Sequence, residues 1–125
     1  MRTPAGSEPD FMPRLRRLFA DGLPERVARM RGGLEGIVAA ADRGAPPDAA
    51  DLEELFLASH SLKGTAPAFD ALDLAHDSGA LSELARHWNP AEVPAPDELA
   101  RAGELLEKVA CGCREAAARV EAAGE

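Results

Sequence analysis

The sequence has little of what a β-sheet needs. Its 125 residues include no tyrosine and one tryptophan, and only eight are β-branched (five Val, two Thr and one Ile). Strands are enriched in β-branched and aromatic side chains, whereas alanine, of which there are 26, is the best helix former. The composition therefore predicts an all-α protein.

Cysteines are few and long apolar runs are absent. Cys111 and Cys113 lie one residue apart in a helix-like stretch, where their side chains would diverge, so we expect free thiols and no zinc site. The longest run of small or apolar residues, 36–41, is far too short to span a membrane, and the N-terminus lacks the apolar core of a signal peptide. We expect a cytoplasmic protein without a membrane partner.

Positive charge is also in short supply. Fourteen Lys and Arg stand against 22 Asp and Glu, a net charge of −8. An acidic surface repels phosphodiester backbones, which argues against a nucleic-acid partner. The chain has no Gly-x-x-x-x-Gly-Lys loop for nucleotide phosphates, so we do not expect an enzyme that uses ATP.

Apolar residues recur at intervals of three and four, which is typical of amphipathic helices. The first such series begins at Phe11 and includes Leu18, is interrupted by Asp21–Pro24, and resumes in phase at Val27. Glycine can end a helix and proline fits the first turn of a new one. We therefore expect a break near Gly22, which would create an extra N-terminal helical segment.

Capping and breaking residues set the expected bounds of the next two helices. Asp48 is a good N-cap for a helix from Ala49. Pro67 should disturb the end of that helix, because proline lacks an amide hydrogen and disfavours helical geometry in the residue before it. Asp70 is expected to start the following helix.

Two loops rich in proline, 43–47 and 89–96, separate the remaining helices. The order of the segments predicts an antiparallel four-helix bundle. We expect a disordered arm at 1–9, a single domain at 10–122 and a tail at 123–125. A monomer is expected, because four helices can close a core alone.

One helix face combines a histidine, a lysine and a glycine. The core stripe of the second helix runs from Leu52 to Ala66, and His60 lies about 120° from its centre, facing solvent. Gly64 follows one turn later, where a larger side chain would lie across the imidazole. Lys63 can bring its ammonium to the same patch. An exposed imidazole can attack phosphorus, and a lysine can neutralise the transferred group, although the spacing equally fits an ordinary surface histidine.

The segment His60-Ser61-Leu62-Lys63-Gly64 resembles the H-x-L-K-G motif of histidine phosphotransfer (HPt) domains of bacterial phosphorelays, and the organisation of residues 10–122 is similar. The resemblance implies that His60 accepts a phosphoryl group from the aspartate of one receiver domain and passes it to another. The partners would be the receiver domains of a hybrid histidine kinase or a response regulator. Lys63 would steady the phosphoryl oxygens and Gly64 would keep the ring accessible.

By the same resemblance, the chain needs no cofactor of its own, because the receiver domain would bring the Mg²⁺. Two positions depart from the family pattern. Asp70 stands where a glycine is usual, and Pro67 falls in the usual continuation of the motif helix.

The sequence also offers candidates for a partner-binding face, and it leaves other functions open. Phe56 and Pro67 share the His60 side of the helix, although they equally fit a core edge and a helix stop. One alternative is a dimerisation-type histidine phosphotransferase, but Ser61 and Thr65 stand where that class has an acidic residue and a proline. Another is a non-catalytic protein-binding bundle.

Overall fold

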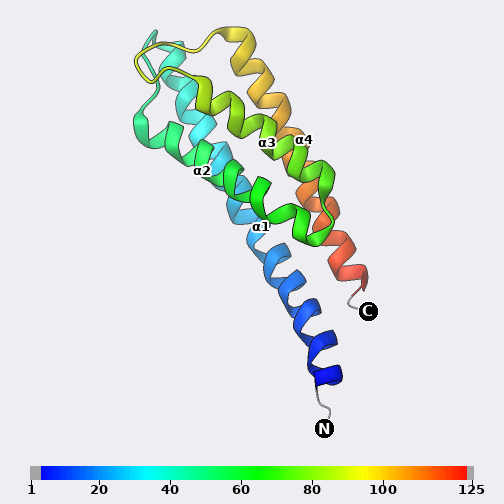
Figure 1. Cartoon of the computed structure of the whole chain (residues 1–125). Coiled ribbons are helices and arrows are strands. Elements are labelled where there is room, and N and C mark those ends of the chain that lie inside the picture. The colour runs from blue at the N-terminus through cyan, green and yellow to red at the C-terminus, as the bar shows by residue number, and fades with distance from the viewer. Residues whose placement is uncertain (1–3, 124–125) are drawn as a thin grey trace.

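The computed structural model describes residues 4–123, which form four α-helices. These are α1 (Pro4–Asp42), α2 (Ala49–Thr65), α3 (Leu72–His87) and α4 (Pro96–Ala123), and the short 3-10 helix η1 (Ala66–Phe69) links α2 to α3. Successive helices run in opposite directions, and α4 returns to pack against α1 (Figure 1). The prediction of an all-α antiparallel four-helix bundle is confirmed.

The core is closed by a narrow stripe of side chains from each helix. The six largest aliphatic and thioether side chains at its centre are almost inaccessible, with relative exposures of 0–1%: Leu23, Met30, Ile37, Leu55, Leu62 and Leu81. Trp88 at the end of α3 is also buried, and its indole Nε1 donates a hydrogen bond to Glu98 Oε1 of α4 at 2.7 Å. This bond satisfies the one polar atom of the tryptophan and fixes the start of α4 against the end of α3.

The helix α1 is continuous, so the expected break near Gly22 and the separate N-terminal helical segment are wrong. Glycine and proline inside a helix cost about 1 and about 3 kcal/mol relative to alanine. The apolar series keeps its phase across the interruption, and Leu23 and Met30 are both fully buried. Burial of each large aliphatic side chain contributes about 1.5–3 kcal/mol, which offsets the local preference for a break.

The N-terminal turns of α1 project beyond the other helices (Figure 1). The helix begins at Pro4, whereas the sequence predicted a disordered arm up to residue 9. Leu18 is 68% exposed and Phe11 is 54% exposed, although both belong to the apolar series of the sequence. Residues 1–3 of the arm and 124–125 of the tail lie outside the described residues.

Both cysteines are free, as expected. Cys111 is exposed, whereas Cys113 is buried in the core, and burial raises the pKa of its thiol to about 11. The Cys113 thiol is therefore protonated at neutral pH. In the described part of the chain, none of the helices has the length and apolar character needed to cross a membrane.

Two glycines of α1 should respond in opposite ways to replacement by alanine. A Cβ atom at Gly22 would meet no other atom within 4 Å, whereas one at Gly33 would lie 2.7 Å from the Asp51 carbonyl oxygen of α2. We expect Gly22→Ala to raise the free energy of unfolding by about 1 kcal/mol through helix propensity. Gly33→Ala should lower it, because α1 and α2 must move apart. Urea denaturation of both variants measures this, and equal effects would contradict the close packing described.

Candidate functional site

His60 lies on the outer face of α2. The helix begins after Asp48, whose carboxylate accepts a hydrogen bond from the Ala50 amide, and it directs one stripe of side chains into the core. That buried stripe consists of Leu55, Ala58, Ser59 and Leu62. The side chain of His60 is exposed, as the helical wheel predicted. Its position on a rigid helix gives the imidazole a fixed place on the surface.

The imidazole of His60 is oriented by Phe56, one turn earlier on α2. The two rings are stacked, with their centroids 5.2 Å apart and their planes 15° from parallel. Phe56 is half-buried and packs against the core, so it provides a firm support for the imidazole. Stacking covers one face of the imidazole with a ring, while Phe56 leaves the edge that carries the two nitrogens uncovered.

Gly64 leaves open space next to this imidazole. A Cβ atom at position 64 would meet nothing within 4 Å, so packing does not require a glycine there. A mid-helix glycine costs about 0.5–1 kcal/mol relative to alanine. The packing of the bundle therefore gives no reason for a glycine at position 64.

Lys63 runs across the surface toward α3, a course that the sequence did not indicate. Its aliphatic stem lies over Gly79 of α3, where an added Cβ atom would be 3.3 Å from Lys63 Cδ and 3.4 Å from Cγ. Gly79 was missed in the sequence, although a glycine inside a helix is the same signal that singled out Gly64. Its lack of a side chain gives the stem of Lys63 room to lie against α3.

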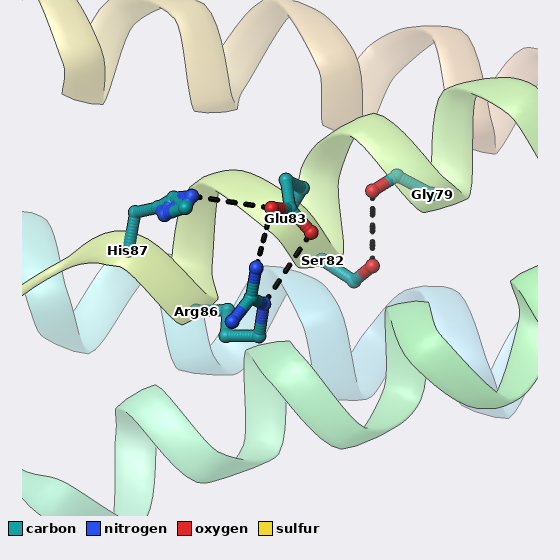
Figure 2. A network of polar contacts seen from close by, with 5 residues as sticks. All are labelled: Gly79, Ser82, Glu83, Arg86 and His87. Carbon is teal, nitrogen blue, oxygen red and sulfur yellow. Dashed lines mark hydrogen bonds and ion pairs between the residues drawn. The ribbon is translucent and has the colours of Figure 1, made fainter.

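A cluster of charged side chains continues along α3 from Gly79 (Figure 2). Glu83 accepts hydrogen bonds from Arg86 at 2.6 and 3.4 Å, and its Oε2 lies 3.1 Å from His87 Nε2. The hydrogen bond from Arg86, assisted by the positive charges of Arg86, His87 and Lys63, lowers the pKa of the Glu83 carboxyl. Ser82 takes no part in these pairs, because its hydroxyl donates to the Gly79 carbonyl at 3.0 Å.

The motif helix ends as Pro67 predicted, but Asp70 does not start the next helix. α2 ends at Thr65 and η1 follows, with the exposed Pro67 in its first turn. Asp70 has a φ of 61° and closes η1 in the left-handed region, so α3 begins only at Leu72. Left-handed geometry is easiest for glycine, which explains why a glycine is usual at this position.

The segment after the motif is tied to the rest of the bundle through α1. Phe69 of η1 stacks on Phe19 of α1, with ring centroids 4.5 Å apart and planes 16° from parallel. The hydroxyl of Thr65 accepts a hydrogen bond from Arg26 of α1 at 3.4 Å. These contacts hold the end of α2 in place despite the change to 3-10 geometry.

The family model described as Hpt domain matches residues 14–123, which is most of the chain. The chain belongs to the Hpt family. No curated protein and no solved structure gives a significant match. Hpt domains are phosphotransfer carriers rather than classical enzymes, and they work with receiver domains in two-component systems. Histidine phosphotransfer is therefore the function that the family assigns to this Hpt domain.

The described residues of this Hpt domain do not provide a metal centre of their own. Between residues 4 and 123, no group of three or more His, Cys, Asp or Glu side chains is placed to hold a metal ion. Lys63 of the motif and Glu83 and Arg86 of α3 are all exposed. The site therefore presents an exposed imidazole together with exposed charged side chains.

The backbone at Asp70 predicts a stabilising substitution in this Hpt domain. Asp70→Gly should raise the free energy of unfolding by about 0.5–1 kcal/mol, because relief of the left-handed strain exceeds the entropy gained by the unfolded chain. Asp70→Val should lower it, because a β-branched residue tolerates a positive φ poorly. Thermal or urea denaturation measures both, and a destabilised Asp70→Gly variant would contradict the strain inferred from φ.

Proposed function

We propose that His60 accepts a phosphoryl group from the aspartyl phosphate of one receiver domain and passes it to the aspartate of another. The unprotonated ring nitrogen forms a bond to phosphorus as the bond between phosphorus and the aspartate oxygen breaks, which releases the aspartate carboxylate. In the second transfer, an aspartate oxygen of the other receiver forms a bond to phosphorus as the bond between phosphorus and the ring nitrogen breaks. The observation that carries the proposal is the exposed imidazole beside the open space at Gly64, within a chain of the Hpt family.

Lys63 is the proposed source of positive charge for the phosphoryl oxygens. Its stem rests on α3, but its side chain is exposed, and among the described residues its ammonium makes no ion pair within 4.0 Å. The terminal carbon and the ammonium can therefore turn toward a group on His60. Phosphoryl transfer depends mainly on positioning and charge neutralisation, so a mobile cation beside a fixed nucleophile suits it.

The receiver domain is proposed to bring the Mg²⁺ and the remaining catalytic groups. It would dock on the face around His60, where Pro67 is exposed and Phe56 supports the imidazole from the core edge. Leu57, on the outer face of α2, is 52% exposed and adds apolar surface beside these two. The closed four-helix core supports action as a monomer.

Replacing His60 should abolish phosphoryl uptake. His60→Gln is expected to remain unlabelled by ³²P-phosphorylated receiver domains from the same genome, whereas wild type becomes labelled. His76→Gln and His87→Gln are matched controls, because both histidines are exposed on α3, and they should be labelled like wild type. The label should be lost in acid and persist in alkali, as expected for a phosphoramidate. Undiminished labelling of His60→Gln would overturn the proposal.

A large side chain at position 64 should slow transfer without unfolding the bundle. Gly64→Leu places a side chain over the turn that holds His60, and we expect transfer from a receiver to slow by about tenfold or more. Gly32→Leu is the control, because Gly32 is an exposed residue of α1 and a Cβ atom added there also meets nothing within 4 Å. Single-turnover labelling measures the rates. A wild-type rate for Gly64→Leu would remove the steric role of Gly64.

A further inference from the structure

Glu83 lies beside the cation that the proposed function assigns to the phosphoryl group. The contact between Lys63 and Gly79 places these two residues opposite each other on neighbouring helices. Glu83 follows Gly79 by four residues and so occupies the same face of α3, one turn further on. Because α2 and α3 are antiparallel, that turn runs back alongside α2 toward the level of His60. The side chain of Lys63 also leans toward the N-terminus of α2, in the same direction.

The carboxylate of Glu83 lies among basic side chains. Arg86 binds it through two hydrogen bonds, and His87 contacts it from the next position (Figure 2). The positive charge of Lys63 also acts on it. The carboxylate is 55% exposed, so it is held by these charges rather than by burial. Glu83 is thus the acidic group of α3 that Arg86 and His87 contact and on which the charge of Lys63 also acts.

We propose that Glu83 sets the stability of the phosphorylated state by competing with a phosphoryl group on His60 for Lys63. This inference rests on the proposed function of His60. In the unphosphorylated protein, the carboxylate attracts the Lys63 ammonium along α3. When His60 carries the phosphoryl group, the ammonium must divide its interaction between two anions. The competition makes the phosphohistidine less stable than Lys63 alone would make it, and so favours onward transfer.

The same competition explains the balance of charges at the site. A carrier that held its phosphoryl group too tightly would not release it to a second receiver. The carboxylate of Glu83 moderates the effect of Lys63 without removing it, because both groups are exposed and interact through water. Glu83 is therefore a tuning residue that acts through Lys63, and it is not proposed to contact the phosphoryl group.

An exchange equilibrium tests this inference directly. Wild-type protein carrying a size tag is labelled on His60 and mixed with unlabelled Glu83→Gln protein. A catalytic amount of a receiver domain from the same genome, one that exchanges label between two wild-type samples, is then added. At equilibrium the label should favour Glu83→Gln by about threefold, the effect of one exposed unit charge acting through water at short range. The preference should shrink as salt is added.

Glu25→Gln is the matched control, because Glu25 also forms an exposed ion pair with an arginine on its own helix, 3.0 Å from Arg29 on α1. It should share the label equally with wild type. In a Lys63→Ala background, the Glu83→Gln substitution should lose most of its effect, which a general change in folding would not produce.

The possible outcomes separate the two proposals. An equal distribution of label between wild type and Glu83→Gln overturns the role of Glu83 while leaving the phosphotransfer function intact. A preference that persists unchanged without Lys63 also overturns it, since the effect would then not pass through that cation. If no receiver domain of the genome labels His60 in the wild-type protein, the proposed function itself fails.

Discussion

The structure depends on the burial of α2 along one narrow stripe. Its buried side chains pack against α1 and α3, and Ser59 can join them because its hydroxyl donates to the Leu55 carbonyl at 2.7 Å. Gly33 of α1 allows the close approach of α1 to α2, and Gly79 of α3 leaves room for the stem of Lys63. Because the buried stripe is narrow, the rest of the α2 surface stays in solvent while the helix itself is held firmly. His60 is therefore both exposed to solvent and carried by a firmly held helix.

A relay carrier needs a nucleophile that stays in place and charges that can move. In the proposed function, the stacking of His60 on Phe56 provides the first, since Phe56 is anchored at the edge of the core. The exposed cations of α2 and α3 provide the second. The site thus combines a rigid helix, which positions the imidazole, with flexible charged side chains. Because the proposed function has the receiver domain complete the chemistry, little further machinery is required of this domain.

The two departures from the usual family pattern are accommodated by one local change of geometry. Pro67 lies in the first turn of η1, where its missing amide hydrogen is not needed for a helical hydrogen bond. Asp70 adopts the left-handed backbone that a glycine would otherwise supply. The stacking of Phe69 on Phe19 then returns the chain to the bundle. The motif helix therefore ends at Thr65, after the turn that carries His60.

The sequence by itself determined the four helices, the exposed face of His60 and the end of α2 just before Pro67, because these follow from local periodicity and backbone chemistry. Only the tertiary structure decided that α1 continues through Gly22 and Pro24, since burial on both sides of the interruption outweighs local propensity. It likewise decided that the stem of Lys63 lies against Gly79 of α3. Those neighbours lie on different helices, and the spacing between helices is set by packing, which no pattern within a single segment records.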